Sequence, residues 1–308
     1  MWALGKKVSV ISRFLSRFRG WIQAGAALLT NLHLPNFLKG GLYQGAGKTV
    51  CVPGLNCYSC PAASGACPIG AFQAVVGSSK FSFSYYITGF LILLGVLLGR
   101  FICGFLCPFG WFQELLHKIP TKKLSTKKLM PLTYLKYAVL LVMVLLLPAF
   151  LVNDVGMGDP FFCKYLCPQG VLEGAIPLSL ANSGIRAALG KLFTWKFSIL
   201  LSVIVLSVVF YRPFCKWLCP LGAFYALFNR VSLFQMKVDK SKCVSCGKCA
   251  RACKMDVDVT KTPNHTECIR CGMCIRACPT NAVCFRYGFG DGKEKENAAT
   301  LRENNNKA

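Results

Sequence analysis

Long apolar stretches separate the charged regions of the first 236 residues. A helix needs about 20 apolar residues to cross a membrane. Four stretches approach this length, so we expect transmembrane helices at approximately residues 20–38, 81–100, 131–153 and 192–211. The first stretch contains several polar residues, and a cleaved signal peptide is the alternative for it. The pattern predicts an α-helical integral membrane protein.

The pattern changes after the last apolar stretch. Residues 1–236 are expected to form a membrane domain, and residues 237–290 a small separate domain rich in cysteine. Residues 291–308 are polar and rich in Asn, Lys and Glu. Such a composition cannot bury enough apolar surface to fold, so we expect a disordered tail.

Eight cysteines of the small domain form two runs, each with the spacing C-x2-C-x2-C-x3-C. This spacing is typical of bacterial ferredoxins with two [4Fe–4S] clusters, in which the fourth cysteine of each run binds the other cluster. The first predicted ligand set is Cys243, Cys246, Cys249 and Cys278. The second is Cys253, Cys268, Cys271 and Cys274. Zinc sites or disulfide bonds are the alternative interpretations. The predicted fold of this domain is a 2[4Fe–4S] bacterial-type ferredoxin of the α+β class.

A second motif, Cys-Pro-x-Gly, occurs four times in the membrane domain, at Cys67, Cys107, Cys167 and Cys219. The last three copies have another cysteine four residues earlier and read C-x3-C-P. Proline is suited to the first turn of a helix. A cysteine directly before it lies where free N–H groups and the helix dipole favour a thiolate. The glycine allows another backbone or a cluster to come close.

The placement of basic residues predicts the orientation. Lys and Arg are concentrated in the N-terminal segment, in the loop after the second expected span and after the fourth, and cytoplasmic loops carry such an excess. Both termini and the ferredoxin domain are therefore expected in the cytoplasm, and the protein in the cytoplasmic (inner) membrane. The chain then consists of two tandem repeats, each with an outer and an inner Cys-Pro motif. Sites of such repeats usually lie at the interface between them.

The repeats predict two further cluster sites. The inner motifs supply four cysteines, enough for one [4Fe–4S] cluster: Cys103, Cys107, Cys215 and Cys219. Six cysteines lie on the outer side: Cys51, Cys57, Cys60, Cys67, Cys163 and Cys167. We expect an outer cluster bound by Cys163 and Cys167 together with two of Cys57, Cys60 and Cys67. Disulfide bonds are the alternative for the outer cysteines, and unligated thiols for the inner ones. Three or four clusters are expected in total.

Composition excludes several other functions. Residues 1–236 hold 22 Lys and Arg but four acidic residues, which could indicate nucleic-acid binding. Because these basic residues flank apolar stretches, membrane topology explains them better, and we expect no nucleic-acid partner. No glycine-rich dinucleotide motif follows a strand pattern, and no catalytic triad or carboxylate pair is present. The pattern therefore indicates electron transfer without a substrate site, and leaves open whether the chain counts as an enzyme or as a relay subunit.

With these motifs together, residues 20–285 resemble the NapH-type membrane ferredoxins and the membrane and ferredoxin part of the NosR regulator. The resemblance implies a cytoplasmic ferredoxin domain, inner motifs at Cys103/Cys107 and Cys215/Cys219, and electron exchange with the quinone pool and with proteins on both sides of the membrane. The outer cysteines depart from the NapH pattern. They resemble a set of 4Fe–4S membrane proteins of anaerobic bacteria, and indicate that electrons reach the outer face.

The resulting expectation is an electron relay between a cytoplasmic low-potential donor and an extracytoplasmic acceptor. The basic ferredoxin domain would attract an acidic ferredoxin or flavodoxin. The acceptor would be a separate flavin- or metal-containing redox protein. Two alternatives remain: a quinol or quinone oxidoreductase subunit, for which quinone is an additional ligand, and a non-catalytic sensor of redox state or iron.

Overall fold

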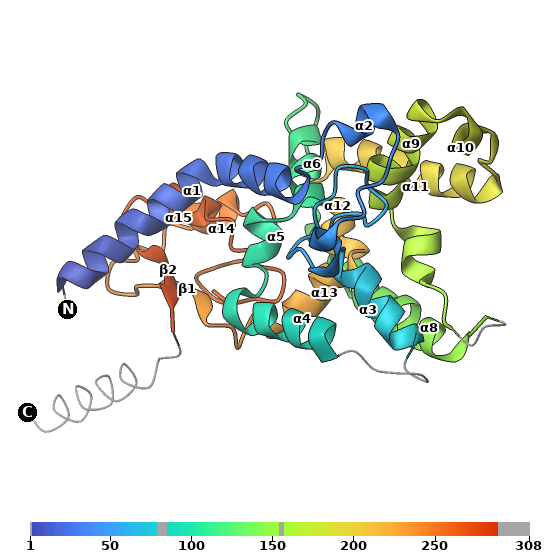
Figure 1. Cartoon of the computed structure of the whole chain (residues 1–308). Coiled ribbons are helices and arrows are strands. Elements are labelled where there is room, and N and C mark those ends of the chain that lie inside the picture. Colours follow the sequence, from blue (N-terminus) through green and yellow to red (C-terminus); the bar gives the residue numbers. More distant parts are fainter. Residues whose placement is uncertain (1, 79–84, 154–156, 289–308) are drawn as a thin grey trace, which may run out of the picture.

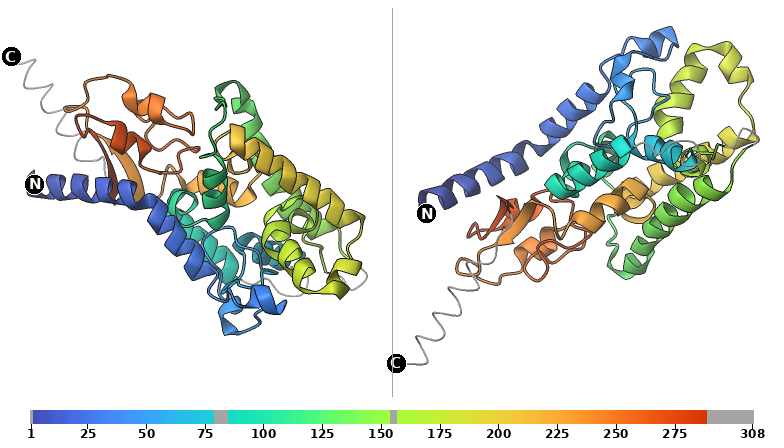
Figure 2. Two further views of the ribbon diagram at one scale, coloured as in Figure 1. Left: turned by 90° about the horizontal axis from the view of Figure 1, so that it is seen from above. Right: turned by 60° about the horizontal axis from the view of Figure 1, so that its bottom comes forward.

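The computed structural model describes residues 2–78, 85–153 and 157–288, with the side chains of the first helix from Val10 onward. Helices make up most of the molecule, and a two-stranded sheet with two short helices forms the C-terminal part (Figures 1 and 2). The expected tail at 291–308 lies outside the described residues.

Two helical segments are long and apolar enough to cross a membrane. The first is Lys127–Phe150, and the second is α11 (Lys191–Val209). The first consists of η2 (Lys127–Tyr134), α7 (Leu135–Val139), η3 (Leu140–Leu146) and α8 (Leu147–Phe150). Only 22% and 17% of their most apolar windows are buried inside the protein. A core helix of a soluble protein would be mostly buried, so these two helices present an apolar surface outward. They overlap the third and fourth expected spans.

The first two expected spans differ from the helices in the structure. α1 (Trp2–Thr30) begins well before residue 20, and α2 (Asn36–Lys39) is a separate short helix. Residues 20–38 do not form one helix, because Pro35 lacks the N–H that a continuous helix would need there. Within the described residues, α4 (Tyr85–Leu98) has 14 residues, fewer than the roughly 20 that a span requires. Residues 81–84 of that expected span lie outside the described part.

The helix α1 has polar side chains toward the protein and apolar side chains outward. Its buried face carries Ser12, Ser16, Arg19 and Gln23. Its opposite face carries the exposed residues Val10, Phe14, Phe18 and Trp21. A helix on the surface of a water-soluble protein shows the reverse pattern. The outer face of α1 is therefore suited to an apolar medium.

The ferredoxin part is built on an antiparallel pair of strands, β1 (Phe234–Val238) and β2 (Val283–Tyr287), with Met236 opposite Phe285. β1 begins three residues before the expected domain boundary at 237. The two short helices are α14 (Lys248–Ala252) and α15 (Met273–Ala277). Each follows a glycine with a left-handed backbone, Gly247 or Gly272, as a tight turn into a helix requires.

The ferredoxin part and the helical part share one hydrophobic core. The ring of Phe101, in α5 (Phe101–Phe105), lies 4.6 Å from the ring of Phe234 in β1. The N-terminal helix adds a polar contact, because the N–H of Phe285 donates to the Ser12 hydroxyl over 3.0 Å. Figure 2 shows α1 alongside the strands in both views. The ferredoxin part is thus docked against the helices rather than joined to them by a free linker.

Short helices complete the described part. They are η1 (Ala46–Thr49), α3 (Pro68–Gly77), α6 (Pro108–Leu116), η4 (Phe162–Leu166), η5 (Gly170–Ala175), α9 (Ile176–Ala181), α10 (Ser183–Ala187), α12 (Pro213–Trp217) and α13 (Pro220–Phe228).

Candidate metal centres

Three of the four Cys-Pro motifs lie at helix starts. α3, α6 and α13 begin at the proline of the motif, and the cysteine before it has an extended backbone. The N–H of Gly222 donates to the sulfur of Cys219 over 3.3 Å. The cysteine therefore lies at the positive end of the helix, next to free N–H groups, as the motif predicts.

Two cavities in the ferredoxin part are lined by cysteines. One is lined by Cys243, Cys246, Cys249 and Cys278. The other is lined by Cys253, Cys268, Cys271 and Cys274. In each cavity three cysteines come from one run and the fourth comes from the other. These are the groupings that the crossed ligand pattern of a two-cluster ferredoxin requires.

The two cavities differ in their exposure. Cys246 is exposed and Cys243 is half-buried, so the first cavity lies near the protein surface. Cys268, Cys271 and Cys274 are buried, so the second cavity lies deeper, toward the helical part. An external partner can approach the first cavity most closely.

The structure brings the four inner cysteines together between α5, α6, α12 and α13. Burial, and then the charges of Cys215 and Cys103, raise the pKa of the Cys107 thiol to about 12. Burial raises the pKa of Cys219 well above its ordinary value, and the charges of the other three inner cysteines add to this rise. Four thiolates in one buried place are unfavourable without a cation, which is the environment a metal cluster stabilises.

A buried glutamine orients one inner thiol. The amide nitrogen of Gln113, in α6, donates to the sulfur of Cys215 over 3.1 Å. The residue at the same place after the first motif, Gln73, donates to the sulfur of Cys163 over 3.2 Å. Each glutamine lies six positions after the motif cysteine of the first half and reaches a cysteine of the second half. Hydrogen bonds to the sulfurs of a cluster tune its reduction potential.

The structure brings Cys57 and Cys67 to Cys163 and Cys167. Burial raises the pKa of the Cys167 thiol well above its ordinary value, and the charges of Cys163, Cys57 and Cys67 add to the rise in that order. A Cβ atom placed on Gly170 would lie 3.8 Å from the sulfur of Cys57. Of the three cysteines left open by the sequence, the geometry thus favours Cys57 and Cys67.

Cys60 packs beside Cys57, and Cys51 lies near Cys67, but neither is among the cysteines that raise the pKa of Cys167 most. The Cys60 thiol contacts the side-chain oxygen of Asn31 at 3.6 Å and packs beside Ala62 and Ala63. Cys51 is buried where the chain pairs with Ala66. The part of the chain that the structure describes includes all 19 cysteines and contains no disulfide bond.

These four groups fit iron–sulfur clusters better than single metal ions. Within residues 2–78, 85–153 and 157–288, no three His, Cys, Asp or Glu side chains converge closely enough to hold one ion. A zinc site would need such convergence. The thiolates around a cubane cluster each bind a different iron atom, so they surround a larger volume. The two cysteine-lined cavities of the ferredoxin part match this second arrangement.

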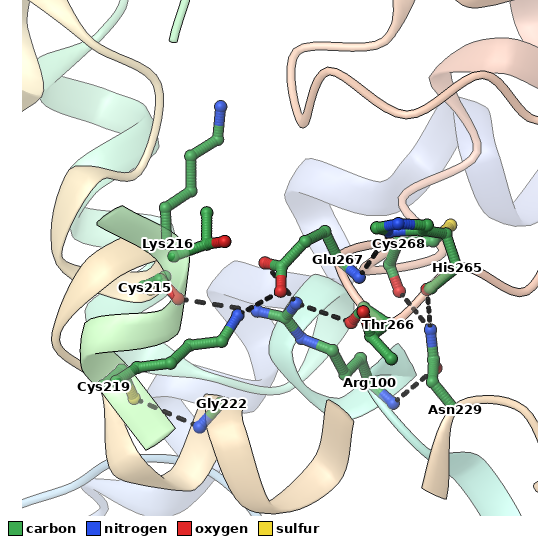
Figure 3. A network of polar contacts seen from close by, with 12 residues as sticks. Arg100, Cys215, Lys216, Cys219, Gly222, Asn229, His265, Thr266, Glu267 and Cys268 are labelled. Atoms are coloured by element: carbon green, nitrogen blue, oxygen red, sulfur yellow. Dashed lines mark hydrogen bonds and ion pairs between the residues drawn. The ribbon is translucent and has the colours of Figure 1, made fainter. Parts of the chain in front are cut away.

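Sequence reasoning missed two arginines next to the inner cysteines, Arg100 and Arg212. Both side chains are fully buried. Arg100 pairs with Glu267 over 3.0 Å, and Arg212 pairs with Glu114 over 2.8 Å. Figure 3 shows Arg100 between Glu267 of the ferredoxin part and the Cys215 turn. Each arginine stands three residues before a C-x3-C-P motif, so the signal R-x2-C-x3-C-P was present twice in the sequence.

Short backbone contacts join the cysteine groups in series. A Cβ atom on Gly104 would lie 2.3 Å from the carbonyl oxygen of Ile269, so the residue after Cys103 touches the residue after Cys268. A Cβ atom on Gly54 would lie 2.8 Å from the Cα atom of Cys107, so these two backbones touch. Because Cys57 follows Gly54 by three residues, the chain separates these points by at most about 11 Å. The inner group thus lies between the ferredoxin part and the outer group.

Comparison with known families agrees with this arrangement. The chain matches the family described as "4Fe-4S binding domain" over residues 65–85, 82–127, 136–176 and 192–241, which together cover half of the chain. Each of these segments contains one Cys-Pro-x-Gly motif. Residues 235–279 match the "4Fe-4S dicluster domain", which coincides with the ferredoxin part.

Several curated proteins are similar to the chain. An uncharacterized protein of Methanocaldococcus jannaschii is 31% identical over 65% of this chain and 77% of its own length. The putative electron transport protein YccM of Escherichia coli is 26% identical over 55% of this chain and 45% of its own length. The regulatory protein NosR of Pseudomonas aeruginosa is 27% identical over 52% of this chain, which spans only 21% of that protein.

The ferredoxin-type proteins NapH and MauN match as well. No solved structure is similar to the chain at a significant level. The sequence matches and the cysteine-lined cavities agree that this is an iron–sulfur electron-transfer protein. The chain belongs to the 4Fe-4S binding family of NapH- and NosR-like ferredoxin-type proteins.

Proposed function

We propose that the chain relays single electrons across the cytoplasmic membrane, from a low-potential donor in the cytoplasm to an acceptor on the outer side. Each of the four cysteine groups would hold one [4Fe–4S] cluster, which supplies a one-electron carrier. The observation that carries the proposal is the series of backbone contacts from Ile269 to Gly104, and from Cys107 to Gly54. This series gives the four groups a single order, from the exposed ferredoxin cavity to the outer cysteines.

A buried aromatic side chain supports the placement of the outer cysteines next to the inner ones. Tyr225 is fully buried, and its hydroxyl donates to the carbonyl oxygen of Pro53 over 3.2 Å. Burial raises the pKa of Tyr225 well above its ordinary value, and then the charges of Cys103, Cys107 and Cys67 raise it further. The ring therefore lies near both the inner and the outer cysteines.

The helix α11 supports a transmembrane arrangement. Near its start, Lys196 donates to the carbonyl oxygen of Cys163, an outer cysteine, over 3.0 Å. Arg212 follows three residues after its end, and its guanidinium donates to the carbonyl oxygen of Cys103, an inner cysteine. Nineteen residues of helix are about 28 Å long, close to the roughly 30 Å of a bilayer core. The outer and inner groups would thus lie at successive depths of the membrane, with the outer group nearer the outer face. The exposed apolar face of α1 would add further contact with lipid.

The lysines around residues 118–128 support the orientation. The ammonium group of Lys123 donates to the carbonyl oxygen of Val208, at the inner end of α11, over 2.7 Å. The next segment contacts the ferredoxin part, because Ser125 donates to Asp256 over 3.2 Å. Basic residues concentrate on the cytoplasmic side of membrane proteins. We therefore place the ferredoxin part and both termini in the cytoplasm, with the two tandem repeats meeting at the inner cysteines.

Charge and exposure support the choice of partners. Residues 237–308 carry 14 basic and eight acidic residues, and Cys246 of the first cavity is exposed. A cationic surface raises the encounter rate with an anionic partner. We propose an acidic ferredoxin or flavodoxin as the donor. On the outer side, a separate flavin- or metal-containing redox protein would accept the electrons.

Proteoliposomes test this function. The purified protein is reconstituted with a reduced low-potential ferredoxin inside and a soluble oxidised acceptor outside, without quinone. The proposal predicts reduction of the external acceptor, and loss of this reduction in Cys167→Ser. Reduction that requires added quinone, and that continues in Cys167→Ser, would contradict transfer to the outer side through the outer cysteines.

One observation favours a second candidate, a quinone oxidoreductase. A cavity between α1, α6 and α15 is lined by Arg19, Trp111, Glu114 and Cys271, among other residues. It combines apolar and polar walls, as small-molecule sites do. Because Cys271 belongs to the second ferredoxin group, a ligand in this cavity would lie next to a redox centre. Adding quinone to the proteoliposomes distinguishes the two functions.

A further inference from the structure

The two arginines beside the inner cysteines cross over between the halves of the chain. Arg100 stands three residues before Cys103, yet its guanidinium donates to the carbonyl oxygen of Cys215 over 3.5 Å. Arg212 stands three residues before Cys215, and its guanidinium donates to the carbonyl oxygen of Cys103. Each half thus supplies an arginine to the cysteine turn of the other half. Figure 3 shows the Arg100 contact.

The region around these arginines has an excess of buried positive charge. Glu267 pairs with Arg100 and also with Lys136, while Glu114 pairs with Arg212 and also with Arg19. Four cations therefore share two carboxylates. Burying an uncompensated charge is costly. A cluster bound by four thiolates is anionic, so the four inner cysteines with their iron would supply the missing negative charge.

The glycine of the first inner motif makes room for an arginine. A Cβ atom on Gly110 would lie 2.9 Å from a guanidinium nitrogen of Arg212. At Gly222 a Cβ atom would lie 3.5 Å from a guanidinium nitrogen of Arg100, which is an ordinary contact. The absence of a side chain at Gly110 therefore allows a cation from the other half to lie over the first turn of the helix.

We propose that Arg100 and Arg212 are positioning residues that hold the two halves together around the inner cysteines and raise the reduction potential of the cluster bound there. This inference rests on the proposed function, because it requires a cluster at the inner site. Reduction adds one negative charge, and nearby fixed positive charge stabilises the more negative state. Charge and hydrogen bonding around a cluster are established means of setting its potential.

The outer site offers a matched control. There, the carbonyl oxygen of Cys163 accepts from Lys196, a single lysine in α11. Cys163 has the same place in its motif as Cys103 and Cys215 have in theirs. Lys196→Gln should therefore alter the outer signal and leave the inner one unchanged, whereas Arg212→Gln should do the opposite.

The test is a potentiometric titration of the anaerobically purified full-length protein, followed by low-temperature EPR. The inner signal is defined as the one that Cys107→Ser lacks. At a fixed potential, Arg100→Gln and Arg212→Gln should each lower the ratio of reduced to oxidised inner cluster about tenfold, which is a fall in midpoint of about 59 mV for one electron. Arg212→Lys, which keeps the charge, should change this ratio less than about threefold.

The outcomes separate this inference from the function on which it rests. Wild-type protein with about eight iron atoms and no inner signal would refute the inner cluster itself. Wild-type protein with the inner signal, but unchanged midpoints in both glutamine variants, would refute only the role of the arginines. If the glutamine variants fail to retain the inner cluster, Arg212→Lys decides. Retention of the cluster with a nearly unchanged midpoint supports the proposal. If Arg212→Lys loses the cluster while its melting temperature is unchanged, the arginine is needed for its side-chain geometry and not for its charge. This result would overturn the proposed effect on the reduction potential.

Discussion

The contact between Gly104 and Ile269 allows the proposed path to be tested with one methyl group. A Cβ atom on Gly104 would lie 2.3 Å from the carbonyl oxygen of Ile269 and 3.8 Å from the backbone nitrogen of Cys271. Carbon–oxygen contacts between backbones are normally about 3.3–3.6 Å long. Gly104→Ala therefore requires the two backbones to separate by about 1 Å, and neither is a flexible side chain that can move aside.

This separation would fall between the inner cysteines and the second ferredoxin group. Overpacking of this kind costs about 1–3 kcal/mol. If the whole cost falls on the contact between the ferredoxin part and the helices, the equilibrium constant for docking decreases by about 5- to 150-fold. The cysteines themselves are unchanged, so all the iron should remain bound. We expect normal iron content, a lower melting temperature and slower reduction of the inner signal after the ferredoxin part has been reduced.

The assay is rapid-freeze EPR of anaerobic protein mixed with a reduced acidic ferredoxin, together with a thermal melt. Gly25→Ala is the control, because a Cβ atom at Gly25 in α1 meets nothing within 4 Å. If Gly104→Ala matched Gly25→Ala in both melting temperature and reduction rate, the contact would not be part of the path, and the proposed order of sites would be refuted.

Four further predictions concern the cysteines, the topology and the donor. Cys107→Ser and Cys219→Ser should each lose about four iron atoms and the same EPR signal, because both belong to the inner group; loss of different signals would separate them. Cys60→Ala should keep the wild-type iron content, whereas Cys57→Ala should lose about four iron atoms; the opposite result would exchange these two cysteines. Cysteine-independent tags at Lys123 and at the C-terminus should report the cytoplasm and a tag near Ser183 the outside; a C-terminal tag found outside would invert the proposed path. Added salt should slow reduction by an acidic ferredoxin in stopped-flow measurements, through screening; a rate independent of salt would contradict the cationic docking surface.

Local spacing alone predicts which ferredoxin cysteines line the same cavity, whereas their binding of clusters stays a prediction. Three thiolates within one short run must face the same cavity, and the cavity lined by Cys243, Cys246 and Cys249 meets this requirement. Likewise, proline fixes where a helix can begin, so the helices α6 and α13 begin at Pro108 and Pro220. Both features depend on residues a few positions apart.

Contacts between distant segments could not be predicted in this way. In the sequence Arg100 lies near Cys103, but its side chain donates a hydrogen bond to the carbonyl oxygen of Cys215, 115 residues away. The choice of Cys57 over Cys60 depends on where a turn more than 100 residues later approaches. The extent of α1 was missed for another reason. Its polar residues face the protein, so the uniformly apolar stretch near residue 20 begins much later in the chain than the helix itself.

The number of iron atoms bound by the full-length protein tests the central claim most directly. Iron and acid-labile sulfide are measured on anaerobically purified protein, and the signals are integrated by low-temperature EPR. Four cysteine groups, each with a cubane cluster, predict about 16 iron and 16 sulfide per chain, falling to about 12 of each in Cys107→Ser and in Cys167→Ser. About eight iron per chain, unchanged in both variants, would confine the clusters to the ferredoxin part and contradict a relay through the helical part.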